Sequence, residues 1–142
     1  MTSLLIPLLL LTQAVAPTLD HIKADPNLEH RAKLAVDFAY AAERSAETAY
    51  SNSDLPGVTE ALKSMVSGME IAKEALDQTG RSASRHPGPY KAVELKSQEI
   101  LVRLGDLEKR MDADERDVIA KPRSRVQEIH DAWFDGIMSK KK

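Results

Sequence analysis

The sequence predicts an all-α protein, and three observations indicate this class. Hydrophobic residues make up 42% of the 142 residues but aromatic residues only 4%, so the core must come from aliphatic side chains, Met and Ala. This composition favours helices over strands. Beyond residue 17 no stretch alternates apolar and polar residues as a half-buried strand does. Apolar residues instead recur at spacings of three and four in four segments, with breaks between them.

Four amphipathic segments of similar length with short connections predict an antiparallel up-down-up-down four-helix bundle. The length suits a single domain, which we assign to residues 17–142. An antiparallel three-helix bundle with the remaining helix docked elsewhere is the alternative architecture.

The first helix is expected over residues 26–52, with Asp25 as its N-cap and Pro26 at its first position. Its apolar stripe consists almost entirely of alanine, which indicates a narrow seam that lets a neighbouring helix approach closely. The stripe comprises Leu28, Ala32, Ala35, Ala39, Ala42, Ala46 and Ala49.

The second helix is expected over residues 56–79, with Asp54 as its cap and Gly80 as its C-terminal stop. The third is expected over residues 89–111, after a loop rich in Ser, Gly and Pro, and has the most regular period in the chain. Gly105 lies inside this third helix, where glycine costs about 1 kcal/mol relative to alanine.

The fourth helix is expected over residues 122–138. We assign residues 112–121 to a connection, because they are acidic at first and because a residue before proline avoids the helical region, which applies ahead of Pro122. The stripe of this helix includes Val126, Ile129 and Trp133, the only Trp of the chain. We therefore expect Trp133 to be buried.

The first sixteen residues have the pattern of a signal peptide. They carry no charged side chain, they contain an apolar run from Leu4 to Leu11, and they end in Ala14-Val15-Ala16, an A-x-A cleavage pattern. Cleavage is expected after Ala16 or, to avoid Pro17, after Ala14. A short membrane anchor is the alternative, although the run is well below the ~20 residues that span a bilayer. The mature domain is then expected in a bacterial periplasm or secreted, without a stable membrane span.

Composition removes several classes of function. The chain has no Cys, which excludes thiol catalysis, disulfides and Cys-ligated metal centres. Its 20 basic and 22 acidic residues give a net charge of −2, which argues against nucleic acid as a partner. No phosphate loop, nucleophile elbow or zinc-protease motif is present, so we do not expect an enzyme.

The histidines are the residues that most invite a site. In the predicted topology the chain start, the second loop and the chain end share one pole of the bundle. His30, His86 and His130 would gather there, together with His21, near several carboxylates. Imidazole and carboxylate suit a divalent transition metal. We therefore name His30, His86 and His130 as candidate metal ligands.

The alternative reading is that these histidines share a pole by chance, because no two of them are spaced i,i+4. A di-iron site would need Glu-x-x-His, and Asn27 and Gln127 stand where the Glu would be.

Two functions remain. The first is an exported non-enzymatic protein, without a cofactor, that binds a protein partner, a cell-envelope component or a small apolar ligand. The alternative is a periplasmic metal or haem carrier that uses the His pole.

Overall fold

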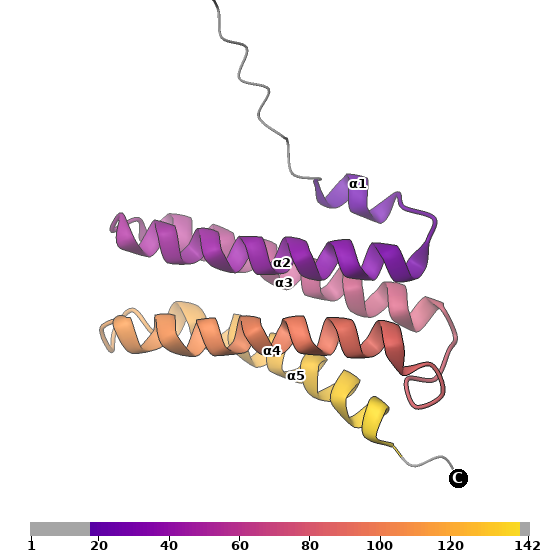
Figure 1. Ribbon diagram of the computed structural model, residues 1–142. Helices are drawn as coiled ribbons and strands as arrows, with labels where there is room; N and C mark the ends of the chain where they lie inside the picture. The colour runs from indigo at the N-terminus through magenta and orange to yellow at the C-terminus, as the bar shows by residue number, and fades with distance from the viewer. Residues whose placement is uncertain (1–17, 140–142) are drawn as a thin grey trace, which may run out of the picture.

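The computed structural model describes residues 18–139 and is all-helical over that range (Figure 1). The helices are α1 (Leu19–Lys23), α2 (Leu28–Ser51), α3 (Leu55–Gln78), α4 (Pro87–Arg110) and α5 (Asp117–Met138). The prediction of an all-α protein with four long helices is confirmed. The predicted signal peptide, residues 1–16, lies outside the described residues. No helix within residues 18–139 is both long and apolar enough to cross a membrane.

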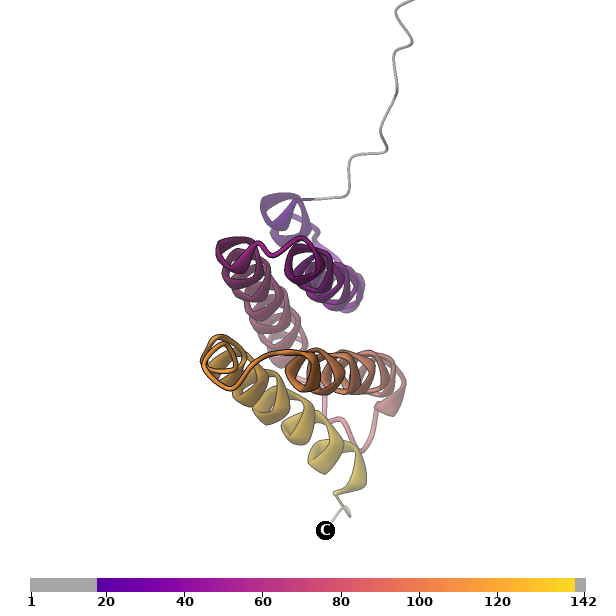
Figure 2. The same ribbon diagram turned by 90° about the vertical axis from the view of Figure 1, so that its left-hand side faces the viewer.

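The four long helices form two hairpins that stack on each other (Figures 1 and 2). One hairpin is α2–α3 and the other is α4–α5; between the hairpins, α2 contacts α4 and α3 contacts α5. Consecutive helices run in opposite directions, so the helices that meet across the stack, α2 with α4 and α3 with α5, run in the same direction. The loop between α3 and α4 therefore crosses from one hairpin to the other.

Side-chain caps fix where the long helices begin. The Asp54 carboxylate accepts a hydrogen bond from the backbone N–H of Gly57 at 2.9 Å, which confirms Asp54 as the cap of α3. At the start of α2 the predicted cap, Asp25, is wrong. Asn27 accepts from the N–H of His30 at 3.1 Å, while Asp25 accepts from the N–H of Asn27 at 2.9 Å. Asp25 thus shapes the turn before the helix, and α2 begins two residues later than predicted.

The start of α5 also differs from the prediction. We expected a connection up to Pro122, but the helix begins at Asp117 and includes that proline as its sixth residue. Pro122 lies past the first turn, so it removes the N–H that would otherwise donate to the carbonyl of Val118, and this loss must be outweighed by packing. Ile119 in this first turn is fully buried in the core. Burial of its side chain explains why the helix extends ahead of the proline.

A short helix that the sequence analysis did not anticipate precedes the hairpins. Thr18 caps α1 by accepting from the N–H of His21 at 3.3 Å, and Ile22 is fully buried. α1 packs on α2, on the side away from α4 and α5 (Figures 1 and 2).

The core lies between the two hairpins and combines small and large side chains. The predicted Ala seam is buried, with Ala32, Ala35, Ala39 and Ala46 fully enclosed. Trp133 is 3% exposed, which confirms its predicted burial.

A candidate binding groove between α4 and α5

A groove of about 550 Å³ runs between α4 and α5 and is lined by residues of these two helices and the turn that joins them. None of its lining residues belongs to α2 or α3. The lining includes Val102, Gly105, Lys109, Arg116, Arg123 and His130. The groove therefore belongs to the α4–α5 hairpin alone.

The outer face of α4 is partly apolar. Val93, Ile100 and Leu104 on its inner face are buried, in agreement with the regular period predicted for this helix. Leu95 and Val102 lie seven residues apart, so they share another face, and their side chains are 56% and 58% exposed. Val102 lines the groove, and Leu95 is placed two turns away on the same face. α4 thus has two apolar side chains on its outer face that the described residues leave more than half exposed.

The end of α5 continues this apolar character. Phe134 is 46% exposed and Met138 is 64% exposed, although both are large and hydrophobic. The ring of Phe134 stacks on that of His130, with centroids 6.2 Å apart and an interplanar angle of 16°. An aromatic and a thioether side chain are therefore presented to solvent next to the groove wall.

His130 joins the two helices of this hairpin. It is 9% exposed; its Nε2 lies 2.9 Å from Glu94 Oε1 on α4, and its Nδ1 lies 3.1 Å from Asp131 Oδ1. The hydrogen bond with His130 is the main reason why the pKa of Asp131 is below its usual value. Both ring nitrogens of His130 therefore lie within hydrogen-bond distance of a carboxylate oxygen.

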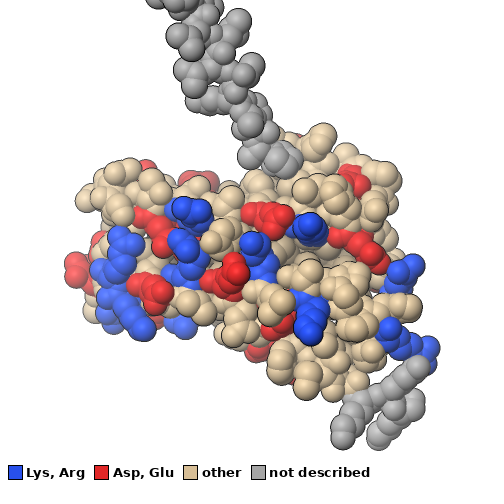
Figure 3. All heavy atoms as spheres, in the orientation of Figure 1, with Lys and Arg blue, Asp and Glu red and all other residues tan. Residues whose placement is uncertain are grey.

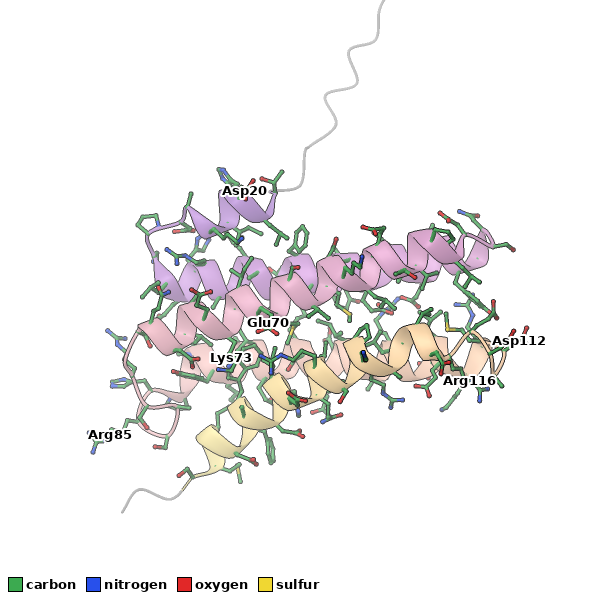
Figure 4. The ribbon with its side chains drawn as sticks, turned by 180° about the vertical axis from the view of Figure 1, so that it is seen from behind. Asp20, Glu70, Lys73, Arg85, Asp112 and Arg116 are labelled. Atoms are coloured by element: carbon green, nitrogen blue, oxygen red, sulfur yellow. The ribbon has the colours of Figure 1, made fainter. Side chains whose placement is uncertain are left out.

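The other end of the groove carries cationic side chains. Arg123 pairs with Glu108, and Arg116 Nε donates to the backbone carbonyls of Glu108 and Met111, at 3.2 and 3.1 Å, where α4 ends. Figure 4 shows Arg116 at the turn between α4 and α5. Lys109 makes no ion pair with any side chain in the described part of the chain. Figure 3 shows Lys and Arg gathered toward this end of the molecule, interspersed with acidic residues.

The structure does not bring the three predicted metal ligands together. His30 Nδ1 pairs with Asp25, His86 is exposed at the N-cap of α4, and His130 is held by Glu94 and Asp131 as described. Within residues 18–139 no group of three or more His, Cys, Asp or Glu side chains is placed to hold a metal ion. Metal binding by His30, His86 and His130 stays a prediction.

Sequence reasoning missed a second polar cluster, at the junction of the hairpins. Glu43 of α2 is fully buried; its Oε2 accepts from Arg103 Nε of α4 at 3.1 Å, and its Oε1 has no hydrogen-bond partner. Glu47 accepts from the same Nε at 3.0 Å. Burial, and then the neighbouring Glu47 carboxylate, raise the pKa of Glu43 to about 8.

A charged residue on an apolar helix face is the sequence signal for the Glu43 cluster, and also for the contact between His130 and Glu94. Glu43 is four residues after Ala39 and three before Ala46, so it shares the buried face of α2. Glu94 stands three residues before the buried Ser97. Buried carboxylates need partners, so each position predicts a cation or proton donor on a neighbouring helix.

On the opposite side of the junction, Arg125 of α5 binds Glu70 of α3, with Nη2 2.8 Å from Oε2. This pair lowers the pKa of Glu70, and Figure 4 shows Glu70 and Lys73 on the edge of α3 near α5. One ion-pair cluster therefore ties α2 to α4, and another ties α3 to α5.

Comparison of the chain with models of protein families, with curated proteins and with solved structures finds no match.

Proposed function

We propose that this protein is exported and acts without catalysis, by binding a protein partner through the groove between α4 and α5. The observation that carries the proposal is the exposure of two apolar side chains on the outer face of α4: Val102, which lines the groove, and Leu95, two turns before it on the same helix, are both more than half exposed. Exposed apolar side chains grouped around a groove are typical of protein interaction surfaces.

The chemistry of the lining favours a protein over the other ligands considered. A pocket for a small apolar ligand is mostly hydrophobic, with few polar groups. This groove has five charged residues in its lining, Asp106, Glu108, Lys109, Arg116 and Arg123. A mixed apolar and charged surface suits the apolar centre and polar rim of a protein interface.

Export is part of the proposal and rests on residues 1–16. On this proposal the four long helices form an up-down-up-down bundle that is released into the periplasm, or secreted, after cleavage. The fusion of residues 1–17 to a reporter that is active only outside the cytoplasm tests the export signal. We expect activity, and N-terminal sequencing of the mature protein should begin at Val15 or Pro17. A full-length chain retained inside the cell would contradict export.

Binding is tested by a photoactivatable amino acid placed at one position at a time in cells that make the protein natively. At Val102 we expect adducts with a partner, which a second substitution, Leu95→Glu, should reduce. At Lys63, on the outer side of α3 and 71% exposed, we expect none. Equal adducts at both positions, or none at Val102, would remove the support for this surface.

A further inference from the structure

No close contact within residues 18–139 requires glycine at position 105. Glycine is less favourable than alanine within a helix, so an interior glycine is normally explained by close contact. A Cβ built on Gly105 would meet only Arg123 Nη2, at 3.6 Å, which is an ordinary van der Waals distance. By contrast, a Cβ on Gly68 would lie 2.8 Å from the carbonyl oxygen of Ala35. Packing between α2 and α3 requires Gly68, whereas the described part of the chain does not require Gly105.

Gly105 lies in the groove, among residues with the spacing of a helix interface. Leu95, Val102 and Lys109 follow one another at intervals of seven residues, and Gln98 and Gly105 form a second series at the same interval. These positions share one face of α4, on which Leu95 and Val102 are the apolar residues, so a helix laid along this face would contact them and pass over Gly105. A position without a Cβ in such a face allows a second backbone to approach closely.

Charge differs along the groove. Three cations line the end of the groove near the turn between α4 and α5: Lys109, Arg116 and Arg123. Arg123 pairs with Glu108, which leaves Lys109 and Arg116 with Asp106 as the remaining carboxylate of the lining. Toward the start of α4 and the end of α5 the exposed side chains are apolar, Leu95 and Phe134 among them. A complementary ligand is therefore apolar along its length and acidic at the end that meets Lys109. A second copy of this face would bring the same cations, with Asp106 as the one lining carboxylate not paired to Arg123.

We propose that the groove between α4 and α5 binds an amphipathic α-helix of a partner protein. Its apolar face lies on Leu95 and Val102, its backbone passes over Gly105, and its acidic residues meet Lys109 and Arg116. This inference rests on the proposed function and specifies the chemistry of the partner.

The test uses the purified protein and a displayed library of amphipathic helices, three heptads long, with Glu, Lys or Gln at random on the flanking positions. We expect enriched helices to carry Glu at one end. Enrichment of basic helices, enrichment without charge bias, or no enrichment would overturn the inference.

The selected helices are then measured against three variants. Gly105→Ala should raise the melting temperature by a few degrees and weaken binding at least fivefold, a combination that loss of folding cannot produce. Lys109→Glu should weaken binding about tenfold. The matched control Lys63→Glu, on α3, should leave binding unchanged. Binding that is indifferent to Gly105→Ala would exclude close approach at that position.

Sedimentation of the protein alone tests whether a second copy of this chain, rather than a partner helix, occupies the groove. A dimer that Gly105→Ala dissociates would assign the face to a second copy and overturn the partner helix. Failure of the library together with a persistent adduct at Val102 would refute the helix and keep the proposed function. Absence of the photo-crosslinked adduct at Val102 would refute the proposed binding of a protein partner at this groove.

Discussion

Each of the two hairpins has a glycine in the interior of a helix, Gly68 in α3 and Gly105 in α4, but only Gly68 packs closely against a neighbouring helix. In the α2–α3 hairpin, a Cβ built on Gly68 would lie 3.1 Å from both the backbone N and the Cβ of Ala39, so the helices meet through small residues. In the α4–α5 hairpin, Gly105 faces a groove, and the helices are joined by His130 with Glu94 and by Arg123 with Glu108. A glycine allows two helices to pack closely only where the backbone of a second helix lies against it.

Trp133→Ala tests how much the core between the two hairpins stabilises the α4–α5 hairpin, whose outer side carries the groove. Trp133 is almost completely buried, so its removal leaves a cavity and loses apolar contact. We expect the free energy of unfolding to fall by about 3–5 kcal/mol, measured by urea denaturation. A loss below ~1 kcal/mol would mean that α5 can leave the core at little cost.

Gly68→Ala tests the close packing of α2 against α3. The added methyl carbon would lie 2.8 Å from the Ala35 carbonyl oxygen, and backbone atoms cannot rotate away as a side chain does. The two helices must separate, and overpacking of this kind costs roughly 1–3 kcal/mol. The melting temperature should fall accordingly. An unchanged or higher value would show that the α2–α3 seam has room to spare, which would remove the contrast with Gly105.

The sequence predicts buried positions better than helix boundaries. The Ala series of α2 and the single Trp133 are visible in the periodicity, because burial selects residue types at regular intervals. The start of α5 is not, since a local rule about Pro122 was outweighed by burial of Ile119, which only the tertiary structure shows.

For the candidate site, the sequence analysis singled out His130 but did not anticipate its contact with Glu94. Pairing of His130 with Glu94 depends on the register between α4 and α5, which spacing within one helix does not contain. For Gly105 the sequence showed only the cost in helix stability. That nothing in the described fold requires this glycine became visible only from the space around it.

Glu43→Gln tests the junction between the hairpins by its dependence on pH. The pKa of Glu43 is about 8 in the folded state and 4.5 as its ordinary value. Because the folded value is the higher one, the unfolded state loses its proton first. The stabilisation is complete below pH 4.5 and is lost as pH rises toward 8.

Wild type should therefore lose on the order of 1–3 kcal/mol of unfolding free energy between pH 5 and pH 9. Glu43→Gln should show a much flatter profile and should be the more stable protein at pH 9. Asp25, Glu70 and Asp131, whose pKa values are lowered, remain ionised throughout this range and do not contribute to the slope. Urea titrations at pH 5, 7 and 9 provide the measurement. Parallel profiles for the two proteins would contradict a protonated Glu43.

Gly105→Ala gives the smallest change and the most specific one, because its sign is opposite to that at Gly68. The methyl group meets only the end of the Arg123 side chain at 3.6 Å, so it introduces no clash, and the unfolded chain loses conformational freedom. We expect a gain of about 0.5–1 kcal/mol in the free energy of unfolding. Paired thermal and urea denaturation of Gly105→Ala and Gly68→Ala measures both signs in one experiment. A loss at both positions would mean that α4 and α5 already meet at Gly105 as closely as α2 and α3 meet at Gly68, and the groove would then have no space for a partner helix.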